Sequence, residues 1–196
     1  MGEIITIFVS AVLIENIILS SFLGICPFLG VSKKTSNAIG MGAALTFVVL
    51  MSSILSYLIN NLVLVNLGLE YLQLVVFILV IATFVQLVEF VTKKYLPSLY
   101  KALGVYLPLI TTNCVVLNVA LTVTGFTDGV ANYNFLNMII YALSISIGYV
   151  FVIVLFSFIR TRLDANGVPA PFQGNAIGLI TAALMALAFA GFTGIV

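Results

Sequence analysis

Two cysteines carry the most distinctive chemistry that this chain offers. Cys26 lies in "FLGICPFLGVSKK", residues 22–34, and Cys114 lies in "PLITTNCVVLNV", residues 108–119. The chain contains no histidine, which excludes histidine-ligated metal or haem sites and histidine-dependent catalytic triads. Cysteine thiolates bind zinc and iron–sulfur clusters. The available chemistry is therefore metal ligation by sulfur, or a disulfide.

The number of ligands limits what one copy of the chain can hold. Tetrahedral zinc and iron–sulfur clusters usually take four protein ligands, whereas this chain offers two cysteines. We therefore expect a metal site that a second chain completes. A disulfide between Cys26 and Cys114 is one alternative, although disulfides are uncommon on the reducing side of a membrane. Two unrelated buried thiols are the other, because free cysteine is often simply buried.

The composition shows where these cysteines must lie. The chain has 196 residues, of which 63% are hydrophobic and 7% charged, and its mean hydropathy is +1.31. An ordinary soluble domain has roughly 25% charged residues. The formal net charge of +1 gives no indication of a nucleic-acid partner. The sequence thus predicts an integral membrane protein, surrounded by lipid and without a separate polar domain.

Hydropathy divides the chain into six predicted membrane spans. A span needs about 20 mainly apolar residues, and the segments that meet this requirement are 4–31, 38–62, 70–92, 102–124, 135–159 and 174–195. We therefore expect an all-α integral membrane fold with six transmembrane helices. The first and fourth spans contain the cysteines and are the irregular ones.

The basic residues predict the orientation of these spans. They fall only in the connections after the first, third and fifth spans, as Lys33, Lys34, Lys93, Lys94, Lys101, Arg160 and Arg162. Alternate connections lie on the same side of the membrane, and the positive-inside rule makes that side cytoplasmic. Both termini are therefore expected outside.

The surroundings of the two cysteines suggest an internal repeat. "CPFLGV" and "CVVLNV" share Cys, Leu and Val at equal offsets. Each cysteine lies in the first span of a three-span half, and a duplicated odd number of spans gives an inverted repeat. We expect one membrane domain, 1–196, with repeats of about 1–95 and 96–196. Chance similarity of two short segments is the alternative.

Each cysteine also lies where the sequence predicts a helix break at mid-membrane. In the first span, Gly24 and Pro27 predict a helix that ends near Phe22 and restarts with Pro27 at its first position and Cys26 as the cap. In the fourth, Pro108 precedes the polar run 111–113. Irregular backbone within a membrane persists only where protein buries it or where it lines a cavity, so both breaks are candidate sites.

Glu15 is a further candidate, because it is a carboxylate within the first predicted span and is followed by Asn16. Intramembrane carboxylates usually face a protein interior or an ion path. Two interpretations remain open for Glu15: a role in ion coupling, and a neutral or hydrogen-bonded packing residue.

Three stretches carry a resemblance to a known family: "FLGICPFLGVSKK", "LPLITTNCVVLNVAL" and "VPAPFQGNAIGLITAALMALAFAGFTG". They resemble the RnfA/NqrE family, found in Rnf ion-translocating ferredoxin:NAD oxidoreductases and in sodium-translocating NADH:quinone reductases. The similarity covers essentially the whole chain. The Pro and Gly of "CPFLG" resemble the Rnf members, and the NqrE component of the quinone reductase is the alternative.

The resemblance implies a specific role for the cysteines. Cys26 and Cys114 match two ligands of a [2Fe–2S] cluster within the membrane, and the homologous RnfE component would supply two further cysteines. The cluster would relay electrons across the bilayer during electron transfer between ferredoxin and NAD, coupled to movement of Na⁺ or H⁺. The chain would thus be one component of an oxidoreductase, without a complete active site of its own.

The resemblance also implies the surroundings of this component. The other partners would be RnfB, RnfC, RnfD and RnfG, which would carry FMN, NAD and further iron–sulfur clusters, in the inner membrane of a prokaryote. A small secondary transporter is the rival from another class, because inverted repeats with broken first helices also describe such folds. A purely structural assembly component is a third possibility.

Overall fold

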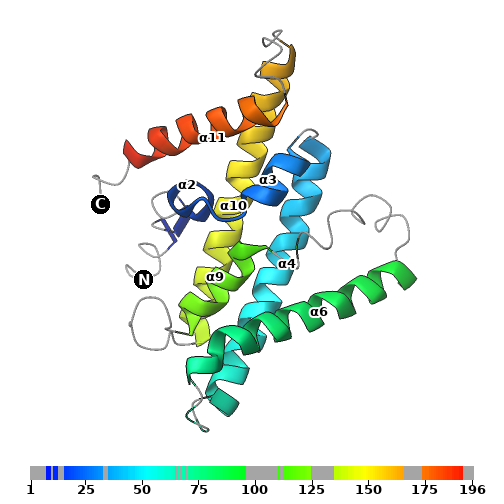
Figure 1. The fold of residues 1–196 in the computed structure, drawn as a ribbon, viewed down its shortest axis with the longest axis vertical. Coiled ribbons are helices and arrows are strands. Elements are labelled where there is room, and N and C mark those ends of the chain that lie inside the picture. Colours follow the sequence, from blue (N-terminus) through cyan, green and yellow to red (C-terminus); the bar gives the residue numbers. More distant parts are fainter. Residues whose placement is uncertain are drawn as a thin grey trace. The chain divides into compact units, whose positions relative to one another are not determined.

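The computed structural model describes residues 8–9, 11–12, 16–32, 35–64, 66, 68, 70–95, 110, 113–124, 135–165 and 174–191. Within these residues the elements are helices and no strand occurs (Figure 1). The predicted all-α fold is confirmed to this extent. Several predictions concern other parts of the chain, because Glu15, the lysines at 33, 34 and 101, Pro108 and both chain ends lie outside the described residues.

The first predicted span contains two short helices, α2 (Ile17–Ser21) and α3 (Ile25–Val31). The long helix α4 (Thr35–Ile59) continues into a π-helical turn, η2 (Asn60–Leu64). A 3-10 turn, η3 (Glu70–Leu72), leads into α6 (Gln73–Tyr95). The later elements are α9 (Cys114–Val123), α10 (Phe135–Ala165) and α11 (Asn175–Ala190).

Three of the described helical segments are long and apolar enough to cross a membrane: 35–64, 73–90 and 135–163. They coincide with the predicted spans 38–62, 70–92 and 135–159. Helices α9 and α11 are apolar but shorter. The apolar helices therefore agree with an integral membrane protein, whereas the count of six spans, the repeat and the orientation stay predictions.

Contacts divide the chain into two compact units, one formed by Met1–Ala43 and Ser144–Val196 and the other by Ala44–Leu143. In the first unit α11 packs against α2 and α3, and this unit contains Cys26. In the second unit α6 packs against α9, and this unit contains Cys114. Each unit is described by itself below.

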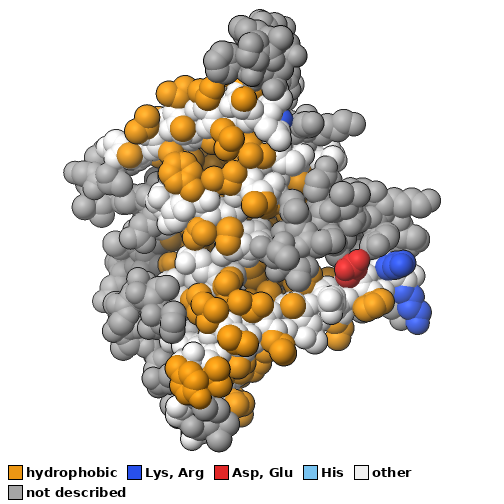
Figure 2. Space-filling model, in the orientation of Figure 1, with side chains coloured by type: hydrophobic (Ala, Val, Ile, Leu, Met, Phe, Trp, Pro, Cys, Tyr) orange, Lys and Arg blue, Asp and Glu red, His pale blue; other side chains and the backbone are white. Residues whose placement is uncertain are grey.

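Apolar periodicity explains the packing inside the second unit. On α6 the buried residues Phe77, Ile81 and Val85 recur every four positions, and on α9 Val115 and Val119 do the same. Residues four apart share one face of a helix, so these stripes form the interior of the second unit. Hydrophobic side chains also cover much of the outer surface, as expected where lipid replaces water (Figure 2).

Candidate functional site

Cys26 lies in the first turn of α3, directly after a break in the chain. Helix α2 ends at Ser21, and its C-cap Phe22 has a φ of 54°, in the left-handed region. Gly24 follows with a φ of 83° and is the N-cap of α3. The predicted helix end near Phe22 is therefore confirmed.

The prediction that Cys26 caps this helix and that Pro27 begins it was wrong. Helix α3 begins at Ile25, so Cys26 is its second residue and Pro27 its third. Glycine adopts a positive φ without steric cost, and Gly24 therefore makes the turn that precedes the helix. Proline is tolerated at Pro27 because backbone N–H groups in the first turn have no partner within the helix.

Cys114 is the first residue of α9, and its helix start is capped by the preceding side chain. The Oδ1 atom of Asn113 accepts a hydrogen bond of 3.1 Å from the backbone N–H of Val115. The backbone N–H of Asn113 donates to the carbonyl of Ile110 over 3.2 Å. Asparagine is among the preferred N-cap residues. The helix start expected at the second cysteine is thus present, although residues 111–112 lie outside the described part.

The two thiols differ in exposure. Cys26 is exposed on this chain, whereas Cys114 is half-buried. In the part of the chain that the structure describes, neither cysteine forms a disulfide, and no group of three or more His, Cys, Asp or Glu side chains gathers. Cys26 and Cys114 stay the two candidate sulfur ligands of this chain.

The N-terminal end of α2 is fixed by Asn16, which the sequence singles out only as a neighbour of Glu15. Asn16 is 1% exposed. Its Oδ1 atom accepts from the backbone N–H of Ile18, and its Nδ2 atom donates to the carbonyls of Val12 and Gly148 over 3.0 and 3.1 Å. All polar atoms of this side chain are satisfied within the protein, so the residue anchors α2 to α10.

Arg160 fixes the opposite end of the broken segment. Hydropathy predicts this residue in a cytoplasmic connection, but α10 extends through Arg160 and the side chain is 3% exposed. Its Nη1 atom donates to the carbonyl of Leu29 over 2.7 Å and to the hydroxyl of Ser32 over 2.9 Å. Arg160 thus lies within a helix and not in a loop, because α10 continues past the apolar segment that hydropathy detects, and its position on the cytoplasmic side stays a prediction.

The second unit contains a buried polar bridge close to the end of α9. The Nε2 atom of Gln73 donates to Thr124 Oγ1 over 2.7 Å and to Asn60 Oδ1 over 3.3 Å. Gln73, Asn60 and Thr124 are 5%, 7% and 7% exposed, respectively. This bridge joins the π-helical turn, α6 and the C-cap of α9, and it was not anticipated from the sequence.

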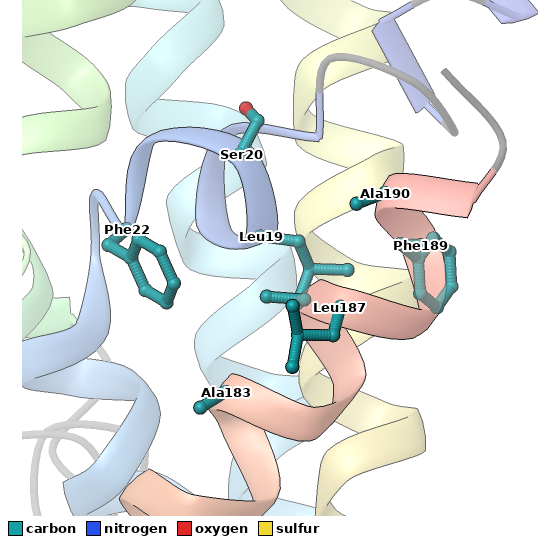
Figure 3. Close-up of a pocket in the computed structure, with 8 residues that line it drawn as sticks. Leu19, Ser20, Phe22, Ala183, Leu187, Phe189 and Ala190 are labelled. Atoms are coloured by element: carbon teal, nitrogen blue, oxygen red, sulfur yellow. The ribbon is translucent and has the colours of Figure 1, made fainter. Parts of the chain in front are cut away.

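An apolar pocket of about 480 Å³ lies between α2 and α11 in the first unit. Its lining includes Leu19, Phe22 and Leu187, and Ser20 is its single polar side chain (Figure 3). Neither cysteine contributes to it. The pocket is therefore separate from the candidate ligand residues.

Comparisons with known proteins agree with these features. Residues 4–196 match the family described as "Rnf-Nqr subunit, membrane protein". A protein of Serratia proteamaculans, named as the A component of an "Ion-translocating oxidoreductase complex", is 53% identical over 196 residues, which is 100% of this chain and 99% of that protein. A protein of the same name from Aliivibrio salmonicida is 51% identical over the same shares. The chain is therefore a member of the Rnf-Nqr family of membrane proteins.

Proposed function

We propose that this chain is the electron-relay component of a membrane-bound ion-translocating oxidoreductase, with Cys26 and Cys114 as two of four cysteine ligands of a shared [2Fe–2S] cluster. One observation carries the proposal: the only two cysteines of the chain each lie in the first turn of a short helix, α3 and α9. The names of the two relatives, which are components of ion-translocating oxidoreductase complexes, support this assignment.

The exposure of the thiols supports a site shared between chains. Cys26 is exposed, so its sulfur is accessible to a second protein. A [2Fe–2S] cluster takes four cysteine ligands, of which this chain would supply two. A homologous membrane protein, RnfE, would supply the other two.

The helix starts give the surroundings that such a ligand set requires. Four thiolates with two sulfides and two ferric ions carry a net negative charge, which is costly in hydrocarbon. The N-terminal end of a helix is the positive end of its dipole, and Cys26 and Cys114 lie at two such ends. When bound, a [2Fe–2S] cluster supplies one-electron transfer at a potential that burial and hydrogen bonds to sulfur adjust.

The wider assembly follows from the same assignment. RnfB, RnfC, RnfD and RnfG would be the remaining partners and would carry FMN, NAD and the other iron–sulfur clusters, in a bacterial inner membrane. The names of the relatives favour this assembly over a sodium-translocating quinone reductase, in which the chain would be NqrE. Electron transfer between ferredoxin and NAD would be coupled to Na⁺ or H⁺ movement, and Glu15 is the candidate for ion coupling in this chain.

Substitution of the cysteines tests the proposal in the intact complex. Cys26→Ser and Cys114→Ser keep the size of the side chain but remove the sulfur. We expect each purified variant complex to lose about two irons and one [2Fe–2S] signal from the EPR spectrum of the reduced protein. Ser21→Ala, which removes an exposed hydroxyl at the end of α2, is the matched control and should leave both unchanged.

The same experiment separates the rival functions. A secondary transporter or a purely structural component does not need its two thiols at the helix starts, so both rivals predict unchanged iron and EPR signals in the serine variants. Full iron content and an unchanged spectrum in Cys26→Ser and Cys114→Ser would end the ligand assignment.

A further inference from the structure

Arg160 is a buried cation whose hydrogen-bond acceptors are neutral. Its Nη1 atom donates to Leu29 O and Ser32 Oγ over 2.7 and 2.9 Å, and its Nη2 atom lies 3.5 Å from the carbonyl of Gly174. Its Nε atom is buried and has no hydrogen-bond partner. A buried charge is costly unless several polar atoms compensate it, so the position of this guanidinium needs an explanation.

The acceptors of Arg160 form the C-terminal end of the helix that carries Cys26. Leu29 lies in the last turn of α3, and Ser32 is its C-cap. The carbonyl end of a helix is the negative end of its dipole, and cations stabilise it. Leu29 follows Cys26 by three residues, which is about 4.5 Å along a helix axis. The positive charge therefore lies at the C-terminal end of the seven-residue helix whose first turn carries the candidate ligand.

Helix α3 depends on such contacts because it has only seven residues. Isolated helices of this length are unstable in water, and tertiary packing must fix them. One turn before Arg160 on α10, the ring of Phe156 packs against Phe28, with the centroids 4.2 Å apart. Phe156 and Arg160 share one face of α10, so that face contacts α3 through both an apolar and a charged side chain.

Helix α11 encloses this contact because Gly178 has no side chain. A Cβ atom added there would lie 3.1 Å from Leu29 Cδ2 and 4.0 Å from Arg160 Nη1. The guanidinium thus lies among α3, α10 and α11 with little free space around it. Such packing limits the directions that the side chain can adopt.

We propose that Arg160 is a positioning residue for Cys26: it holds α3 by its carbonyl end and places a fixed positive charge at the end of the short helix that carries the cysteine ligand. This inference rests on the proposed function of Cys26 as a cluster ligand. A fixed cation near a redox centre favours the reduced, more negative state. Loss of the charge should therefore lower the reduction potential of the cluster. Loss of the hydrogen bonds to Leu29 O and Ser32 Oγ should broaden the distribution of positions that Cys26 adopts.

The test compares Arg160→Met and Arg160→Lys with Arg162→Met in the purified complete complex. Arg162 is the matched control because it lies on the same helix and is exposed. The readouts are the midpoint potential and the EPR linewidth of the [2Fe–2S] signal that Cys26→Ser removes. We expect Arg160→Met to shift the midpoint to a more negative potential and to broaden the line. Arg160→Lys should recover more than half of the potential shift, and Arg162→Met should match the wild type.

Two outcomes overturn the inference. One is a potential and a linewidth in Arg160→Met equal to those of the wild type, and the other is an equal shift in Arg162→Met. If the complex with Arg160→Met does not assemble, Arg160→Lys is the deciding variant, because it keeps the positive charge but loses the geometry of the guanidinium hydrogen bonds. An EPR linewidth equal to that of the wild type in Arg160→Lys would then overturn the positioning role. Failure of the proposed function is distinct, since Cys26→Ser would then leave every EPR signal in place.

Discussion

The side-chain amide of Asn16 donates a hydrogen bond of 3.1 Å to the backbone carbonyl of Gly148, and this contact joins the start of α2 to α10. Twelve positions further along α10, Arg160 holds the end of α3. One long helix therefore contacts the broken first segment at both ends. The segment between them contains Cys26.

The close approach at Gly148 predicts that a methyl group is not tolerated there. A Cβ atom at this position would lie 3.1 Å from Asn16 Nδ2 and 3.2 Å from the backbone Cα of Val12. Gly148→Ala should therefore destabilise the protein by about 1–3 kcal/mol, the usual cost of overpacking. Thermal unfolding of the detergent-solubilised protein measures the effect. Gly191→Ala is the control, because nothing lies within 4 Å of an added Cβ there, and an equal loss in both variants would contradict the prediction.

Removal of the N-cap at Asn113 should weaken the start of α9. Asn113→Ala loses the hydrogen bond to the N–H of Val115 and should cost about 1 kcal/mol. Asn113→Ser keeps a capping oxygen and removes an amide nitrogen that is buried without a hydrogen-bond partner, so it should cost less. Thermal unfolding ranks the two variants. A serine variant less stable than the alanine variant would argue against a capping role.

The polar bridge at Gln73 should contribute to the stability of the second unit. Gln73→Leu leaves Asn60 Oδ1 without its donor, whereas the Thr124 hydroxyl still donates to Ala120 O, and one unsatisfied buried acceptor costs about 1–3 kcal/mol. Gln86 on the same helix is exposed on this chain, so Gln86→Leu should leave the stability nearly unchanged. Comparison of the unfolding temperatures of the two leucine variants checks this, and equal temperatures would refute it.

Glu15 lies outside the described residues, and its proposed role in ion coupling is tested by function. Glu15→Gln keeps the size of the side chain and removes its charge. We expect fewer ions to be taken up per electron transferred in proteoliposomes, with the [2Fe–2S] signal unchanged. Asn66→Asp, at an exposed site whose Nδ2 donates to Leu62 O, is a control for a change of charge. Normal coupling in Glu15→Gln would leave Glu15 as a packing residue.

The local pattern around Cys26 predicted part of the site correctly. Gly24 and Pro27 indicated a helix break, and the helix does end one residue before Phe22. The restart was placed two residues too late because Pro27 was taken as the first helical position, whereas proline fits any position of the first turn. In the structure Gly24 has a positive φ and is the N-cap, so the helix starts at Ile25.

The long apolar helices were predictable because hydropathy depends only on neighbouring residues. Predicted span 38–62 compares with α4 and η2 together, and span 135–159 lies within α10. The same method missed Arg160, since a charged residue beyond an apolar run is indistinguishable from a loop residue until its partners are known. The signal available in the sequence was that Arg160 follows Phe156 by four residues, which places both side chains on the same face of a helix.

The sequence by itself determined the class of protein, the approximate bounds of its long helices and the two sulfur atoms available as ligands. These properties follow from composition and from periodicities within one segment. Only the tertiary structure decided what fixes the cysteine-bearing helix α3, because Arg160 and Leu29 are 131 residues apart and Asn16 and Gly148 are 132 apart. Burial favours these distant polar contacts, since a polar group in an apolar interior is costly unless it finds a partner within the fold.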